Sequence, residues 1–283
     1  MQITESFINK LINFGNTLSE KIVSIQNRNP EVYTKEDNSP LTEADILSNK
    51  LIREFLSKNS EVTSFISEEE KLSDFNMRKN WEYFWVIDPI DGTKEFVKGG
   101  SDYCVNIALC RGSKPVFGYV LVPKTKTHYY AIEHLGAFKN GKSIECSQSI
   151  NDGIKIVASK SHLNKDTENF IKILESLDKF KLNAGGVETV NVGSSLKLCL
   201  VAEGKADVYP RYGPTMEWDT CAPHIILQEA GGEIYQAQEL GIHPCNLTYF
   251  MLNKKPALVY NKESLLNPYF ICYSKAFAGL FNE

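Results

Sequence analysis

The segment from Trp85 to Thr93 constrains the fold most, because an apolar run there ends abruptly in two carboxylates, Asp88 and Asp91. The apolar residues predict a buried strand over 83–87. Asp-Pro and Asp-Gly pairs also form ordinary turns, which is the alternative interpretation of the same residues. Because a buried strand that ends in carboxylates can deliver them to a cation, the segment favours a metal site over a plain turn.

The composition fits a soluble globular protein. The 283 residues suffice for one large domain or two lobes with a shared interface, and 42% are apolar against 23% charged. The formal net charge is −4, and no long Lys/Arg block is present. Duplex nucleic acid is therefore excluded as an expected partner, whereas a local basic pocket for a small anion remains compatible with the sequence.

The cysteines and the N-terminus indicate a cytoplasmic protein. The seven cysteines are scattered and contain no Cys-x-x-Cys pair, which indicates reduced thiols rather than disulfides or a zinc site. The N-terminus lacks the features of a signal peptide, and no apolar run approaches the roughly 20 residues that span a bilayer. No integral membrane segment is expected, while peripheral attachment to the inner face of the membrane and the oligomeric state stay open.

The first half of the chain predicts helices packed on an antiparallel or mixed sheet. Apolar residues at steps of three and four predict helices over 3–25 and 42–59, separated by a polar loop over 27–40. Strands are predicted over 62–67, 83–87, 103–110, 115–122 and 128–132, with the third and fourth forming a hairpin.

The second half alternates strands and helices more regularly. Strands are predicted over 154–159, 206–209 and 233–236, and helices over 165–177, from 193 onward and over 218–229, the last closed by Gly231-Gly232. No linker is long enough to separate independent domains. We expect an N-terminal lobe (1–150) and a C-terminal lobe (151–283) that form one folding unit with a shared cleft.

Five acidic residues are candidates for one site at an end of the sheet: Asp45, Glu68, Asp88, Asp91 and Asp219. Carboxylates at close range raise one another's pKa unless cations neutralise them, and oxygen ligands of this kind suit Mg²⁺. Each also has a local interpretation. Thr42-x-x-Asp45 fits a capping box, Asp219 fits a helix N-cap, and Glu68-Glu69-Glu70 fits a solvated charge run.

A second group of residues suits an anion. Gly193-Ser194-Ser195-Leu196-Lys197 offers hydroxyls, backbone N–H groups and a lysine at a predicted helix start, where the helix dipole is positive. A simple Ser N-cap explains the same residues equally well. Arg211 and His162 add cationic side chains that fit either a second phosphate or an ordinary surface.

Other hydrolase classes fit poorly. The chain has no G-x-x-x-x-G-K-[ST], no G-x-S-x-G and no H-E-x-x-H. Haloacid-dehalogenase phosphatases carry Asp-x-Asp-Gly-Thr, but here two residues separate Asp88 from Asp91. That spacing disfavours an aspartyl nucleophile.

These motifs together resemble the lithium-sensitive, Mg²⁺-dependent phosphatase superfamily that contains the inositol monophosphatases. Its first motif is similar to residues 85–93, and its second to Trp218-Asp219-Thr220-Cys221-Ala222-Pro223 followed by Gly231-Gly232. Thr93-Lys94-Glu95-Phe96 and Val105-Asn106-Ile107-Ala108-Leu109, among other segments, look like the CysQ-type 3′(2′),5′-bisphosphate nucleotidases. The resemblance covers nearly the whole chain and implies a layered αβαβα sandwich, an α/β (α+β) fold.

The resemblance also implies a role for each candidate residue. Metal ligands are expected at Glu68, Asp88, the Ile90 carbonyl, Asp91 and Asp219, holding two or three Mg²⁺ ions. Thr93 and Asp45 are expected to orient the attacking water, with Glu68 also among the catalytic residues. Substrate contacts are expected from Gly92, Thr93, His162, Ser194, Lys197, Arg211 and Asp219. Two departures from the family pattern, Glu43 and Pro223, remove no ligand.

The implied reaction is hydrolysis of 3′-phosphoadenosine 5′-phosphate to AMP and phosphate, without a covalent intermediate, as by-product removal in sulfate assimilation. Sensitivity to millimolar Li⁺ is a further expectation from the resemblance. Two alternatives stay open: an inositol monophosphatase or sugar (bis)phosphatase, and a nucleotide- or metal-sensing binding protein without catalysis.

Overall fold

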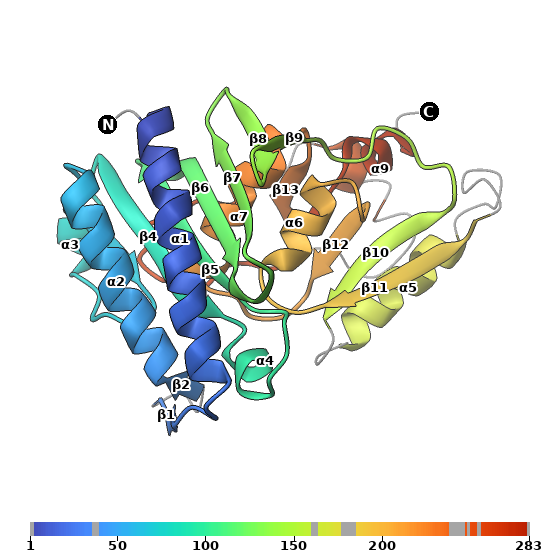
Figure 1. The fold of residues 1–283 in the computed structure, drawn as a ribbon. Coiled ribbons are helices and arrows are strands. Elements are labelled where there is room, and N and C mark those ends of the chain that lie inside the picture. The colour runs from blue at the N-terminus through green and yellow to red at the C-terminus, as the bar shows by residue number, and fades with distance from the viewer. Residues whose placement is uncertain are drawn as a thin grey trace.

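The computed structural model describes residues 3–35, 40–159, 164–176, 185–237, 247, 250–253 and 256–281. Helices and sheets alternate in layers across the molecule (Figure 1). This arrangement confirms the layered αβαβα fold predicted from the family resemblance.

The helices are α1 (Glu5–Gln26), α2 (Glu43–Asn59), α3 (Phe75–Arg78), α4 (Thr93–Val97), α5 (Lys165–Ser176), α6 (Leu196–Ala202), α7 (Glu217–Glu229) and α9 (Lys275–Gly279), with the 3₁₀ helix η1 (Pro123–Thr125). The strands are β1 (Val32–Thr34), β2 (Pro40–Thr42), β3 (Phe65–Ser67), β4 (Tyr83–Asp91), β5 (Cys104–Arg111), β6 (Lys114–Val122), β7 (Thr127–Ile132), β8 (Gly136–Lys139), β9 (Lys142–Ile144), β10 (Ile154–Ser159), β11 (Val187–Val192), β12 (Val208–Arg211), β13 (Glu233–Gln236) and β14 (Phe270–Tyr273).

A seven-stranded sheet, in the order β3-β4-β5-β6-β7-β8-β9, carries α1 and α2 on one face (Figure 1). β3 runs parallel to β4 and the other neighbours are antiparallel, which gives the mixed sheet that the sequence predicted. The stripe of α1, including Leu11, Leu18 and Ile22, is buried against this face together with Trp85 and Ile87 of β4. Burial of each such side chain contributes about 1.5–3 kcal/mol.

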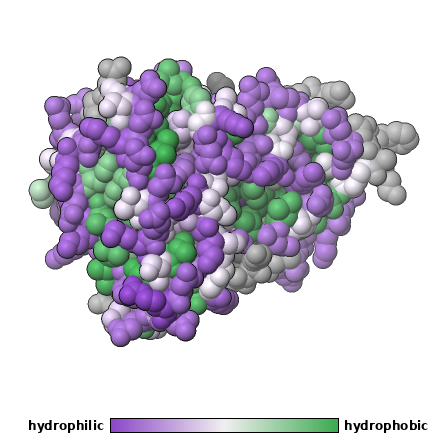
Figure 2. Space-filling view, viewed as in Figure 1, coloured by the Kyte–Doolittle hydropathy of each residue, from purple (hydrophilic) through white to green (hydrophobic). Residues whose placement is uncertain are grey.

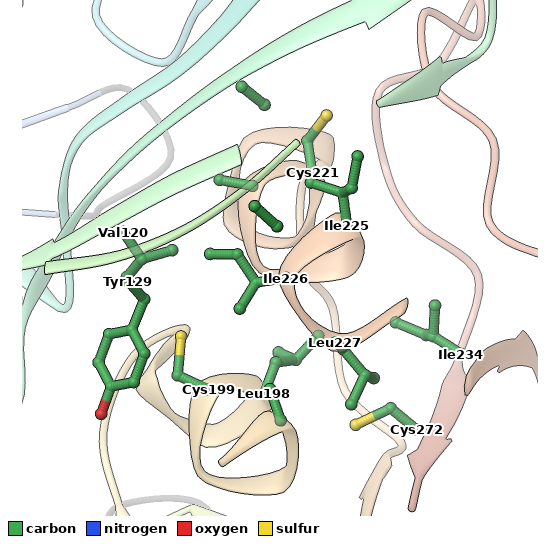
Figure 3. Packing of buried hydrophobic residues seen from close by; sticks show 14 of the residues in the cluster. Val120, Tyr129, Leu198, Cys199, Cys221, Ile225, Ile226, Leu227, Ile234 and Cys272 are labelled. Carbon is green, nitrogen blue, oxygen red and sulfur yellow. The ribbon is translucent and has the colours of Figure 1, made fainter. Parts of the chain in front are cut away.

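α6 and α7 form the middle layer and pack against both sheets (Figure 3). Ile226 and Leu227 of α7 belong to one buried cluster with Val120 of β6 and Cys272 of β14. Gly118 of β6 allows this close approach, because a Cβ atom there would come within 2.3 Å of the Ala222 carbonyl oxygen on α7. The helix backbone therefore rests directly on the strand.

A five-stranded sheet, in the order β11-β10-β12-β14-β13, forms the next layer. β10 pairs in parallel with β11 and β12, whereas β14 is antiparallel to both of its neighbours. α5 and α9 cover its outer face through Phe170 and Phe277, which pack with Ile271. Along the chain, the seven-stranded sheet ends with β9 and the five-stranded sheet begins with β10. In space, α6 and α7 lie between the two sheets.

Several sequence predictions need correction. The segment 27–40, predicted as a loop, contains β1, which pairs antiparallel with β2, and its three residues are all exposed, so they show no alternation of buried and exposed positions. β4 continues through Pro89 to Asp91, beyond the predicted end at residue 87. β3 is shorter than predicted, and β12 is shifted to 208–211. The sequence also missed β8, β9, β11, β14, α3, α4 and α9, which are short or exposed elements with weak periodicity.

The surface and the thiols are as expected for a globular chain. Figure 2 shows a face on which hydrophilic residues predominate, with apolar residues in between. Within the part of the chain that the structure describes, no helix is both long and apolar enough to cross a membrane. All six described cysteines are buried and free, in agreement with the prediction of reduced thiols.

Candidate metal centre and active site

Three carboxylates meet where β4 ends against the N-terminus of α7. Asp88 and Asp91 come from β4 and Asp219 from α7, and one oxygen of each lies within 4.8 Å of the others. The register between β4 and β5 shifts between Asp88 and Asp91, and this bulge allows both side chains to reach the site. In a regular strand, residues three positions apart, as Asp88 and Asp91 are, would point to opposite faces of the sheet.

Asp88 has the burial and the chemistry suited to a cation ligand. The residue is 1% exposed, and among the residues that the structure describes neither of its carboxylate oxygens has a hydrogen-bond partner. Burial raises the pKa of Asp88 well above its ordinary value, and the nearby charges of Glu68 and Asp91 raise it further. Since an unpaired buried carboxylate is very costly, the chemistry of this donor set fits a bound divalent cation.

Asp91 and Asp219 are held by backbone N–H groups. Ser195 N–H donates to Asp91 Oδ2, and Met216 N–H donates to Asp219 Oδ2 at 2.9 Å. Burial raises the pKa of both carboxyls, and with the added charge of Asp91 it brings that of Asp219 to about 8. Each residue thus has one oxygen anchored while the other remains for a ligand.

Glu68 follows β3 and extends the acidic cluster. Burial raises the pKa of Glu68 above its ordinary value. The charge of Lys35, whose Nζ lies 2.8 Å from Glu68 Oε1, opposes this rise. The same ammonium lies 2.5 Å from Glu69 Oε1. Sequence reasoning missed Lys35, because it stands in a polar segment with no spacing signal that links it to residues 33 and 34 positions later.

Asp45 fulfils its capping prediction and also reaches the site. Its Oδ2 accepts hydrogen bonds from Thr42 N at 2.7 Å and Thr42 Oγ1 at 2.6 Å, which completes the capping box of α2. Its Oδ1 lies 3.3 Å from Thr93 Oγ1, which is also 3.1 Å from the Ile90 carbonyl oxygen. One carboxylate therefore serves the helix and the site at once.

Gly92 permits the turn that presents Thr93 at the start of α4. Its φ is +94°, and a Cβ atom would approach the Asp102 carbonyl oxygen to 3.0 Å. Only glycine adopts this conformation without strain. The predicted Asp-Gly turn is therefore present, and it follows the carboxylates rather than replacing them.

Two cationic side chains line the same cavity, which has a volume of about 670 Å³. Lys197 of α6 is 6% exposed, and burial lowers its pKa to about 8 although the charge of Asp91 opposes this. Arg211 of β12 donates from Nη2 to the Pro214 carbonyl at 2.9 Å, and its buried Nε has no hydrogen-bond partner within the described part of the chain. Ser194 also lines the cavity and donates to Cys104 Sγ at 3.1 Å.

The structure thus brings together all but one of the predicted site residues. His162 lies outside the described residues. Glu43 is exposed in the first turn of α2, and Pro223 lies inside α7, which continues through it as one helix. Because proline has no N–H, the Asp219 carbonyl lacks its usual helical donor there.

In the metal-free protein, these carboxyls make stability depend on pH. The pKa of Asp219 is about 8 in the folded chain, against about 4 for an unfolded aspartate. Between these values the folded chain binds more protons, so its stability falls as pH rises. We expect the thermal midpoint in EDTA to fall from pH 6.5 to pH 8, and stabilisation by Mg²⁺, which binds ionised carboxylates, to grow. Scanning fluorimetry with and without Mg²⁺ measures both.

The pH window avoids the buried histidines. Burial lowers the pKa of His128 and His224, so their contribution to stability changes only below about pH 6.5. The variant Asp219→Asn cannot ionise at this position and is expected to show a shallower fall in EDTA. A wild-type midpoint that stays constant or rises between pH 6.5 and 8 would contradict the prediction.

Comparison with known proteins gives one consistent family. The model of the inositol monophosphatase family matches residues 3–269. The 3′(2′),5′-bisphosphate nucleotidase CysQ of Salmonella typhimurium is 38% identical over 210 residues, which cover 74% of this chain and 80% of that protein. The enzyme of the same name from Escherichia coli K12 is 35% identical over 242 residues, or 85% of this chain and 87% of the relative.

Solved structures agree with the sequence relatives. CysQ from Bacteroides thetaiotaomicron superposes with a TM-score of 0.74 at 39% identity, covering 92% of this chain and 94% of that one. Staphylococcal inositol monophosphatase-1 in a LiCl-soaked inhibitory complex has a TM-score of 0.73 at 20% identity, covering 100% and 97%. An IMPase/NADP phosphatase complexed with Mg²⁺ and phosphate has a TM-score of 0.69 at 21% identity, covering 97% and 95%.

Proposed function

The chain belongs to the inositol monophosphatase family, and we propose that it is a Mg²⁺-dependent 3′(2′),5′-bisphosphate nucleotidase that hydrolyses 3′-phosphoadenosine 5′-phosphate to AMP and phosphate. It is thus a phosphoric monoester hydrolase. The proposal assigns two or three Mg²⁺ ions to Glu68, Asp88, the Ile90 carbonyl, Asp91 and Asp219.

The observation that carries this proposal is the charge distribution along one cavity. Carboxylates of Glu68, Asp91 and Asp219 line this cavity, and so do the cationic side chains of Lys197 and Arg211. A substrate with two separated phosphates matches this arrangement, because one phosphate would face the metal ligands and the other the cationic side chains. A monoester with a single phosphate would leave Lys197 and Arg211 without a second phosphate to bind.

The residues of this chain divide the chemical work. When bound, Mg²⁺ polarises the phosphoryl group and stabilises charge on the leaving oxygen. The Thr93 hydroxyl lies within hydrogen-bond distance of Asp45 Oδ1, and when its O–H donates a hydrogen bond there, its lone pairs would accept one from the attacking water. Backbone N–H groups of Gly92 and Thr93 would bind the scissile phosphate. Ser194, Lys197 and Arg211, with His162, would hold the nucleotide and its 5′-phosphate, and Asp219 would contact the substrate as well.

A second candidate, hydrolysis of inositol or sugar phosphates, is favoured by the same acidic cluster, which is suited to any phosphate monoester. The cationic residues discriminate between the two candidates. Each charge-assisted hydrogen bond to a 5′-phosphate contributes about 1.5–3 kcal/mol, or roughly tenfold to a hundredfold in kcat/KM.

Phosphate release from a small substrate panel tests the proposal. With Mg²⁺, we expect kcat/KM for 3′-phosphoadenosine 5′-phosphate to exceed that for 3′-AMP and for inositol 1-phosphate by about tenfold or more. EDTA is expected to abolish release, and millimolar Li⁺ to inhibit it. The 3′-AMP control differs from the substrate only in the 5′-phosphate, so it reports on the cationic residues alone.

Each outcome decides between the candidates. Equal rates with 3′-AMP would remove the role of the 5′-phosphate, and preference for inositol 1-phosphate would favour the second candidate. Binding of nucleotide without any Mg²⁺-dependent release would instead identify a binding protein.

A further inference from the structure

Asn106 of β5 lies beside the metal cluster and has no assigned role in the chemistry. It pairs with Asp88 across the β4–β5 ladder and is 1% exposed. Alternate residues of β4 face opposite sides, and Asp88 continues the side of Phe84 and Val86, which packs toward α6 and α7. Directly opposite residues in an antiparallel pair have Cβ atoms about 4.5–5.5 Å apart, so the Asn106 and Asp88 side chains are neighbours on this face.

The hydrogen bonds of Asn106 are incomplete in an informative way. Its Oδ1 accepts a hydrogen bond from Ser195 Oγ at 2.8 Å, whereas its buried Nδ2 has no acceptor among the described residues. Both oxygens of the neighbouring Asp88 likewise lack a donor. Turning the amide over would direct its oxygen toward the carboxylate and its NH₂ toward Ser195. The observed orientation avoids that repulsion and leaves the NH₂ for the side of Asp88, with no hydrogen bond between the two groups in this structure.

Ser195 extends the connection to a second metal-binding carboxylate. Its hydroxyl is held by Asn106, and its own backbone N–H donates to Asp91 Oδ2. Ser195 also directly precedes α6, the helix that carries Lys197, but its side chain makes no capping hydrogen bond there. Asn106 is therefore the neighbour of Asp88 in the sheet, and it is linked to Asp91 through Ser195. Through Ser195 it also connects the acidic cluster to α6, the helix that carries Lys197.

From this juxtaposition we propose that Asn106 is a positioning residue of the metal centre, which orients Asp91 through its hydrogen bond with Ser195 and presents its amide NH₂ beside the Asp88 carboxylate. The inference rests on the proposed function only for the presence of Mg²⁺ at these carboxylates. Hydrogen-bonded partners of this kind fix the orientation of metal-ligating carboxylates, and their loss typically weakens metal binding or activity by about 10–100-fold.

Mg²⁺ binding without substrate tests the proposal by isothermal titration calorimetry on the full chain. Asn106→Ala is expected to weaken Mg²⁺ binding about tenfold or more, and Ser195→Ala, which keeps its backbone N–H, about threefold. Because Ser195 acts through Asn106, the double variant is expected to bind within twofold of Asn106→Ala. Tyr119→Phe is the matched control. It removes the buried hydrogen bond between Tyr119 of β6 and His128 of β7, in the cluster that faces α1, and should leave Mg²⁺ affinity unchanged.

Thermal midpoints in EDTA separate positioning from general destabilisation. We expect Asn106→Ala and Tyr119→Phe to unfold within about 3 °C of each other, which corresponds to a stability difference of about one hydrogen bond. If Asn106→Ala fails to fold, Ser195→Ala alone carries the test. The proposal would be overturned if Asn106→Ala bound Mg²⁺ within twofold of the wild-type affinity. If only Ser195→Ala folds, the same limit applies to that variant. Additive losses of affinity in the double variant would also overturn it. Wild-type protein that binds Mg²⁺ but releases no phosphate would instead contradict only the proposed function.

Discussion

Asp91→Asn is expected to lower Mg²⁺-dependent phosphate release by about 10³-fold, a loss on the order of 4 kcal/mol in transition-state stabilisation. Asparagine keeps the shape of the side chain but removes one negative charge from the three clustered carboxylates. It also turns an acceptor of the Ser195 N–H into an amide that can present a donor there. Steady-state kinetics across Mg²⁺ concentrations measure the effect, which we expect mainly in kcat and in the Mg²⁺ requirement.

Asp207→Asn is the matched control for this prediction. Asp207 is also buried, and burial also raises its pKa, but its Oδ2 accepts a hydrogen bond from Lys155 N in the five-stranded sheet, away from the cluster. We expect its kcat to stay within about threefold of wild type, since it contacts neither substrate nor metal ligands. Phosphate release that survives Asp91→Asn at wild-type rates would refute the proposed mechanism.

Thr93→Val is expected to lower kcat by about 10²–10³-fold, in the range of a lost proton-transfer contact. Valine matches the shape of threonine, but the hydroxyl that links Asp45 Oδ1 and the Ile90 carbonyl is absent. Mg²⁺ affinity should stay within about threefold, because the clustered carboxylates are intact. Rapid-mixing measurements of phosphate release, together with calorimetric Mg²⁺ titration, separate these two quantities.

Thr93→Ser provides the conservative comparison, because serine restores the hydroxyl with only one methyl group missing. We expect it to recover most of the lost kcat. Asp45→Asn combined with Thr93→Val should be little slower than Thr93→Val alone, since the two residues act on the same water. Equal rates for the valine and serine variants would show that the hydroxyl takes no part in the reaction.

The local parts of the structure followed from the sequence, and the contacts between distant segments did not. The apolar spacing of residues 3–25 predicted α1, and the run before Asp88 predicted β4, because these signals depend on neighbouring residues. β1 and β2 could not be recognised, since the β1 residues are exposed and carry no burial pattern.

The candidate site shows the same limit. Asp45 fits a capping box, which the structure contains, whereas Asp219 is the third residue of α7 rather than its N-cap and accepts a hydrogen bond from the N–H of the N-cap residue Met216. The local and functional interpretations coexist because a carboxylate has two oxygens, one for its own helix and one for the site. Sequence spacing alone could not distinguish them, and the family resemblance was needed to assign the functional role. Ser195 and Lys35 were missed as partners because their contacts with Asp91 and Glu68 span 104 and 33 residues.

The contact between Gly118 and α7 has a consequence for tolerance to mutation. A methyl group at position 118 would collide with the Ala222 carbonyl, one turn of helix after Asp219. The helix would have to shift, and its carboxylate would move with it. A substitution at Gly118, which has no polar side chain and no contact with substrate, would therefore reduce catalysis. The reason is that β6 fixes the position of α7 and, with it, of Asp219.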